Sequence, residues 1–207
     1  RLATATALLD LGTGGGEFLA SLSTRPVPTH ATEAYAPNIR VAQARLAPLG
    51  VTVVPVEADG QLPLPPDGVD LVIDRHEYYD PAEVFRVLKP GGTFLTQQVG
   101  PHDCVQLNQY LDAPIEPDAI TWEFRQEVDA LAAAGFDVVH AQEALLETRF
   151  LDIGAVVYYL KVIEWQIPDF SVERYDARLR AMHRLLERDG VFFATSHRYL
   201  IEARKPE

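Results

Sequence analysis

Short apolar runs alternate along the chain with segments whose apolar residues recur every three or four positions. Residues 69–74 (VDLVID) are almost continuously apolar, which is typical of a strand covered on both faces. Strands separated by helical segments predict βαβ units and a parallel sheet. We expect a helix that begins near Gly16, further helices at 38–49, 81–88, 123–134, 153–165 and 171–188, and strands at 7–11, 29–32, 51–56, 69–74, 93–99, 138–141, 145–150 and 192–201.

Length and composition suit one α/β domain that spans residues 1–207. The longest apolar stretch, at about residues 153–163, is too short to cross a bilayer, and the chain opens without a secretory signal. Cys104 is the only cysteine, so no disulfide can form within the chain, and we expect a structural thiol and a cytoplasmic protein. Because the chain begins at Arg1, without a methionine, we also expect that an N-terminal segment is missing.

The net charge of −12 bears on possible partners. An acidic surface repels phosphate backbones, so the charge disfavours a nucleic-acid partner unless a local basic groove exists. We expect no membrane partner, and a monomer or a homodimer.

The most informative local pattern is LLDLGTGGGEFLA, at residues 8–20, where a glycine loop follows a predicted strand and precedes a predicted helix. Such a loop lets a ligand approach the backbone at the carboxyl edge of a parallel sheet. The dinucleotide spacing G-x-G-x-x-G is not met, because Glu17 stands at its third glycine position. Asp10 ends the strand, and its carboxylate favours a ligand that is cationic or rich in hydrogen-bond donors over a polyphosphate.

The segment Asp10–Gly16 resembles the D-x-G-x-G-x-G motif of the class I S-adenosylmethionine (SAM)-dependent methyltransferases. RVLKPGGTFL, at residues 86–95, resembles the stretch of that family that leads from a helix into the fifth strand. The resemblance covers residues 8–99, and it implies a three-layer Rossmann-like sandwich with a mostly parallel seven-stranded sheet whose last strand is antiparallel. It also implies that SAM is the cofactor and S-adenosylhomocysteine (SAH) the product.

Several residues acquire a cofactor role through this resemblance. Glu33, after the second strand, stands where the family has an acid for the ribose hydroxyls, and Asp59 resembles its acid on the adenine side. Each has a simpler alternative: Glu33 as an exposed acid at a helix start, and Asp59 as the first residue of an Asp-Gly turn. The resemblance implies a cofactor site formed by Asp10, Gly12, Thr13, Gly14, Gly16, Glu33, Ala34, Asp59, Gly60, Asp74 and Arg75.

The acceptor side is expected just after the fourth strand, over residues 74–79. Methyl transfer from a sulfonium needs chiefly alignment and exclusion of water, so a base is required only for some acceptors. His76 is our candidate base, with His102 as a second candidate and a loop-bracing role as the alternative for His76. No metal site is expected.

Three further patterns bear on the acceptor. The segment 149–170 is rich in aromatic residues, and Tyr158, Tyr159 and Trp165 either line a pocket for a flat acceptor or pack in the core. Residues 100–118 are short and polar, so the sequence predicts no large lid there. The family's N-P-P-[YF] tetrapeptide is absent after the fourth strand, which argues against methylation of amide or adenine nitrogens. A small-molecule acceptor is therefore our first hypothesis. RNA or protein methylation, a non-catalytic SAM- or SAH-binding module and a nicotinamide dehydrogenase are the alternatives.

Overall fold

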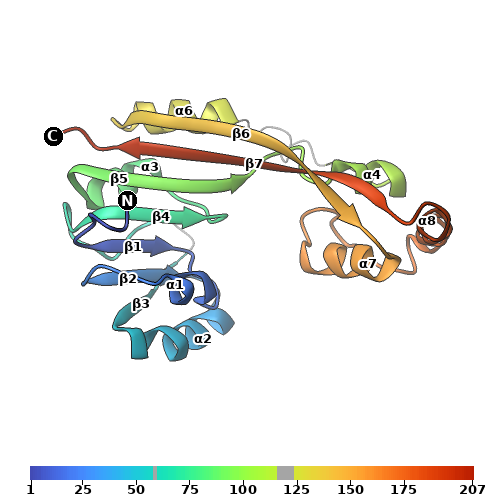
Figure 1. Ribbon diagram of the computed structural model, residues 1–207, viewed down its shortest axis with the longest axis horizontal. Helices are drawn as coiled ribbons and strands as arrows, with labels where there is room; N and C mark the ends of the chain where they lie inside the picture. Colours follow the sequence, from blue (N-terminus) through green and yellow to red (C-terminus); the bar gives the residue numbers. More distant parts are fainter. Residues whose placement is uncertain (58–59, 116–123) are drawn as a thin grey trace. The chain divides into compact units, whose positions relative to one another are not determined.

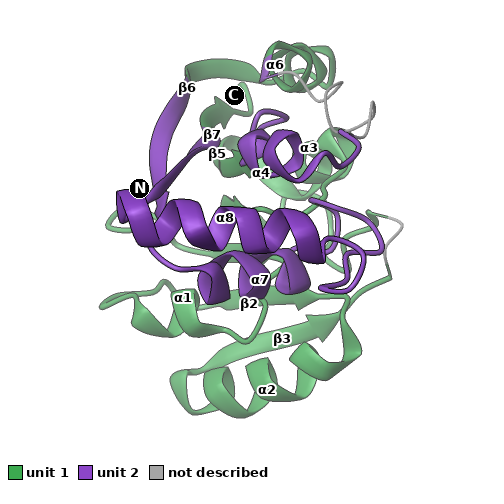
Figure 2. Ribbon diagram, turned by 90° about the vertical axis from the view of Figure 1, so that its right-hand side faces the viewer, with its two compact units in different colours: residues 1–98, 125–142, 199–207 green, residues 99–124, 143–198 purple. Residues whose placement is uncertain are grey.

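The computed structural model describes residues 1–57, 60–115 and 124–207. Figure 2 shows that they fall into two compact units. Unit 1 comprises residues 1–98, 125–142 and 199–207, and unit 2 comprises residues 99–124 and 143–198. Strands β5 (Leu88–Val99), β6 (Asp137–Phe150) and β7 (Phe192–Arg204) each have residues in both units. The expectation of a single domain therefore stays a prediction.

A seven-stranded sheet with the order β3-β2-β1-β4-β5-β7-β6 forms the framework. Strands β1 (Leu8–Leu11), β2 (Thr29–Glu33), β3 (Val51–Pro55), β4 (Val69–Arg75) and β5 pair in parallel. Strand β7 runs in the opposite direction (Figure 1). This arrangement confirms the predicted fold class, a Rossmann-like sheet with one antiparallel strand.

Alternation along the strands divides the apolar residues of unit 1 between the two faces of the sheet. On one face, Leu95 packs against a cluster that includes Leu46 of α2 (Ala36–Leu46) and a residue of α1 (Glu17–Ser21). On the other face, the next residue of β5, Phe94, packs against the Phe136 ring, and Phe136 in turn packs against Phe85 of α3 (Pro81–Val87). The first cluster consists of Leu8, Leu19, Ala31, Ala42, Leu46, Val51, Val53, Leu71 and Ile73.

The strand register brings the carboxyl ends of the parallel strands to one edge. Leu11 pairs with Asp74, and Glu33 pairs with Pro55. Because parallel strands end at the same edge, the loops after β1, β2, β3 and β4 lie next to one another. The loop after β1 is the glycine loop, so this edge is where a ligand would bind.

Asp70 fastens the start of the chain to β4. Its carboxylate accepts hydrogen bonds from the Thr6 amide (2.9 Å) and hydroxyl and from the Ala7 amide (2.9 Å). We expect Asp70→Ala to lower the free energy of unfolding by about 2 kcal/mol, because it leaves these donors without their charged acceptor. Urea denaturation measures the loss. Asp176→Ala, which removes an exposed ion pair with Arg180, should cost below about 1 kcal/mol, and an equal loss in both variants would refute the role of Asp70.

Unit 2 has a hydrophobic core of its own. Helices α4 (Val105–Leu111), α7 (Ile153–Val162) and α8 (Asp176–Asp189) supply most of it. Cys104 is 1% exposed within this core, and burial raises the pKa of its thiol. The thiol is therefore a packing group, as predicted. The buried residues are Cys104, Leu107, Leu111, Phe150, Val156, Leu160, Ile167, Tyr175, Leu179, Met182, Leu186 and Ala194.

Several sequence predictions differ from the structure, and one difference is that β5 begins at Leu88 instead of residue 93. Residues 138–141 and 145–150 belong to the single strand β6, and α8 begins at Asp176 instead of residue 171. The helix predicted over 153–165 ends at Val162, and α4 lies in a segment for which we predicted no element. The described residues also form η1 (Ala47–Leu49) and α6 (Phe124–Ala133). Within the described ranges, no helix has the length and apolar character needed to cross a membrane.

Candidate functional site

A cavity of about 160 Å³ opens at the carboxyl edge of the sheet, wholly within unit 1. Its described lining comes from the ends of four neighbouring strands in the order β3, β2, β1, β4. Neighbouring strands lie about 4.8 Å apart, so the four ends extend over about 14 Å. An elongated ligand fits such a site better than a compact one. The lining residues are Leu11, Gly12, Thr32, Glu33, Ala34, Val56, Glu57, Gly60, Gln61, Leu62, Glu77, Tyr78, Tyr79, Asp80 and Val84.

The glycine loop depends on left-handed backbone. Gly12, Gly14 and Gly16 have φ of 57°, 61° and 81°, a region that other residues rarely adopt. Gly12 also tolerates no side chain, since a Cβ there would lie 2.6 Å from the Cβ of Glu77. The loop is joined to β2, because the Thr13 amide donates to the Thr32 carbonyl oxygen (2.9 Å).

Two buried carboxyl groups end β1 and β2. Glu33 is 5% exposed, and its Oε1 accepts a hydrogen bond from the Tyr35 amide (2.8 Å). Asp10 is 3% exposed, and burial raises its pKa to about 6, against lowering contributions from the Thr13 side chain and the charge of Arg75. Glu33 lines the cavity, whereas Asp10 is outside its described lining.

A buried hydrogen-bond network links the ends of β4 and β5. The Asp74 Oδ2 atom accepts hydrogen bonds from the Thr96 hydroxyl (2.8 Å) and from the side-chain Nε2 of Gln98 (2.6 Å). The same Nε2 also donates to the Glu77 carbonyl oxygen (2.8 Å). Burial raises the pKa of Asp74 to about 7, against lowering contributions from its hydrogen bonds with Thr96 and the Glu77 amide; the charges of Glu77 and Asp10 raise it further. The network holds the loop after β4 against the sheet.

The structure brings part of the predicted cofactor set into the cavity. Gly12, Glu33, Ala34 and Gly60 line it, and Asp59 lies outside the described residues. The other predicted cofactor residues are close in sequence but outside the described lining: Asp10, Thr13, Gly14, Gly16, Asp74 and Arg75.

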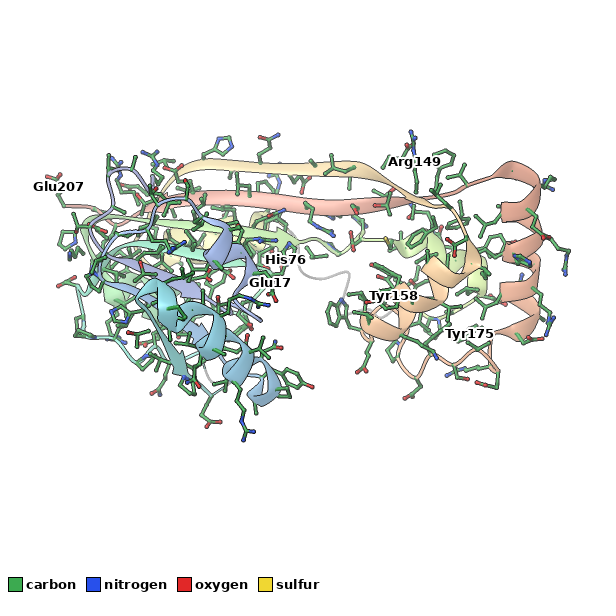
Figure 3. The ribbon with its side chains drawn as sticks, turned by 60° about the horizontal axis from the view of Figure 1, so that its bottom comes forward. Glu17, His76, Arg149, Tyr158, Tyr175 and Glu207 are labelled. Carbon is green, nitrogen blue, oxygen red and sulfur yellow. The ribbon has the colours of Figure 1, made fainter. Side chains whose placement is uncertain are left out.

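The candidate base His76 lies in the turn after β4. It has a φ of 65°, and its amide donates to the Gln97 carbonyl oxygen (2.9 Å). The residue is exposed, and the described cavity lining does not include it. Figure 3 shows His76 and Glu17 at one edge of unit 1, with Glu207 at the opposite edge. The guanidinium of the neighbouring Arg75 stacks over the Phe18 ring, 4.4 Å from its centroid.

The other acceptor candidates belong to unit 2. His102 stacks on His197 with ring centroids 5.3 Å apart, and Tyr159 donates to the Asp103 carboxylate (3.2 Å). Tyr158 and Trp165 are 72% and 67% exposed (Figure 3 labels Tyr158). Core packing therefore accounts for Tyr159 but not for Tyr158 or Trp165.

Sequence reasoning missed several groups of this edge. Thr96 and Gln98 join Asp74 through strand pairing, and Leu62 lines the cavity next to Gly60. The Tyr79 hydroxyl donates to Glu127 of α6 (2.6 Å), and burial raises the pKa of both groups. The one signal in the sequence was that the end of β5 shares an edge with the end of β4. In the described part of the chain, no group of three or more His, Cys, Asp or Glu side chains could hold a metal ion.

Comparisons with known proteins agree with this geometry. Residues 8–92 match the family described as methyltransferase domain, and no curated protein sequence is significantly similar to the chain. A candidate methyltransferase of Bacillus halodurans has a similar fold (TM-score 0.67, 18% identity, 97% of this chain and 93% of that one). So does a SAM-dependent methyltransferase of Aquifex aeolicus (TM-score 0.56, 16% identity, 97% and 82%).

A third similar structure contains ligands. It is phosphoethanolamine N-methyltransferase 2 of Haemonchus contortus, in complex with phosphomonomethylethanolamine and SAH (TM-score 0.59, 18% identity, 99% of this chain and 49% of that one). Residues 8–92 therefore resemble a methyltransferase domain, and the whole chain shares the fold of these solved structures.

Proposed function

We propose that the chain transfers a methyl group from SAM to a small-molecule acceptor, and that the cavity in unit 1 binds the donor. The observation that carries the proposal is the charge of the described lining, which has four carboxylates and no basic side chain. A pyrophosphate would be repelled there, whereas SAM has a sulfonium, an ammonium and ribose hydroxyls. The carboxylates are Glu33, Glu57, Glu77 and Asp80.

We assign the parts of the donor to the strand ends as follows. Glu33, at the end of β2, accepts the ribose hydroxyls, with its Oε1 already oriented by the Tyr35 amide. The apolar side chains of Val56 and Leu62 then receive the adenine, and Gly12 receives the methionine part. Asp10 supports the loop from behind, and both units are assigned to one methyltransferase domain because three strands run through both.

Calorimetric titration with SAM, SAH and NAD tests the proposal. We expect SAM and SAH to bind and NAD not to bind, and binding of NAD alone would refute the proposal. Incubation with labelled SAM and a metabolite extract then tests transfer. Label on RNA or protein would favour a macromolecular acceptor, and binding without transfer to any acceptor would favour a non-catalytic module.

Glu33→Ala should weaken the binding of SAM and SAH equally, by about 10- to 100-fold, because two hydroxyl groups lose a charged acceptor. Calorimetry gives the ratio, and a thermal melt shows whether the variant is folded. Glu207→Ala removes an exposed carboxylate at the opposite edge of unit 1 and should leave both affinities unchanged (Figure 3). Normal binding by Glu33→Ala would contradict the ribose assignment.

A further inference from the structure

Glu77 is a carboxylate of the cavity lining to which the donor assignment above gives no role. It belongs to the loop after β4, the strand next to β1, and its side chain lies against Gly12 at the start of the glycine loop. If the ribose lies at Glu33, the sulfur of the donor, one carbon beyond the ribose ring, lies over β1. Its nearest carboxylate in the described lining is then that of Glu77.

The position of Glu77 is held by several contacts. Its amide donates to Asp74 Oδ1 (3.2 Å), and its carbonyl oxygen accepts from Gln98 (2.8 Å). Its side chain lies against the bare Cα of Gly12, and its Oε1 accepts from the Tyr78 amide (3.0 Å). These contacts fix the backbone of Glu77 and hold its carboxylate next to Gly12 of the glycine loop.

Resting on the proposed function, we propose that Glu77 is a specificity-determining residue that favours the charged donor SAM over its neutral product SAH. SAM and SAH share the adenosine, the ammonium and the carboxylate, and they differ in the methyl group and the positive charge on sulfur. A carboxylate beside the sulfur therefore stabilises one ligand and leaves the other almost unaffected. Such a preference would limit inhibition by the product.

Calorimetric titration of the whole chain with SAM and with SAH tests the proposal. Glu77→Gln keeps the shape of the side chain and removes its charge. We expect SAM to bind about tenfold more weakly to this variant and SAH to bind within about twofold of wild type. Equal changes for both ligands would overturn the proposal.

Glu57→Gln is the matched control, since it removes a carboxylate from the β3 end of the same cavity. It should change both affinities by the same factor, and a selective loss of SAM binding there would also overturn the assignment to Glu77. The wild-type preference should decrease as salt is added, which is measurable even if the Glu77 variant does not fold. A wild-type chain that binds neither ligand refutes the proposed function itself, whereas an unaltered SAM-to-SAH ratio in Glu77→Gln refutes only this inference.

Discussion

The Gly12→Ala variant is expected to lose at least about 100-fold in affinity for SAM. Gly12 has a φ of 57°, and a Cβ there would lie 2.6 Å from the Cβ of Glu77, so the loop must move away from β4. Left-handed strain and displacement of the loop act together, each at a cost on the order of 1–3 kcal/mol. Calorimetric titration with SAM measures the loss.

Two variants separate these causes. Gly50→Ala has similar strain at a φ of 73°, with no atom within 4 Å of the added Cβ and no part in the cavity. It should cost on the order of 1 kcal/mol in stability and leave SAM binding unchanged. The double variant Gly12→Ala/Glu77→Gly removes the steric conflict, so it should recover part of the folding stability lost by the single variant. No recovery would show that the close approach of Glu77 is not the cause.

The second large effect is a fall in the free energy of unfolding as the pH rises from about 4 to about 7. Burial raises the pKa of Asp10 to about 6 and that of Asp74 to about 7 in the folded protein, whereas an unfolded aspartate titrates near 3.9. The folded state therefore holds these protons to higher pH. The contribution of Asp10 and Asp74 to the free energy of unfolding is complete below about pH 3.9, the pKa of an unfolded aspartate. It is lost as the pH rises through about 6 and about 7, the pKa values of the two groups in the folded protein.

Asp74→Asn isolates this effect, because asparagine stays neutral and can still accept from Thr96 and Gln98. Relative to wild type, the variant should gain on the order of 2–4 kcal/mol in stability between pH 4 and pH 8. Urea denaturation at several pH values measures this gain. Asp176→Asn, at an exposed site, should give a nearly constant difference, and an equally constant difference for Asp74→Asn would contradict a raised pKa.

The sheet of unit 1 was predictable because burial dictates its pattern. Strand β4 is central and mostly buried, so its apolar run marks it out in the sequence, and the edge strand β3 is marked by its β-branched residues. Strand β6, at the other edge, has no continuous run of either kind, and all but one of its residues are exposed or half-buried. Its polar centre therefore divided one strand into two predicted strands. Helix α8 was predicted to begin at residue 171 because Val172 and Tyr175 continue its apolar stripe. In the structure these two residues precede the helix and pack on the same core.

Part of the candidate site could also be read from the sequence. Gly12 was expected from the glycine loop after a predicted strand, and Glu33 from the resemblance to the methyltransferases; both line the cavity. The partners of Asp74 could not be identified, because Thr96 faces it through a strand register that depends on tertiary structure. The close approach of Glu77 to Gly12 was missed for the same reason, since it joins loops far apart in the chain.

The route of the chain through the two units sets an order for its folding during synthesis. Residues 199–207 belong to unit 1, where they bury Ile201 and Ala203 and join Lys205 to Gly91 and Gly92 by backbone hydrogen bonds of 2.9 Å. The first half of the chain thus waits for the last residues before its sheet is complete. Such long-range closure is slow, and it leaves the apolar strands of unit 1 incompletely covered until residues 199–207 have been added to the sheet.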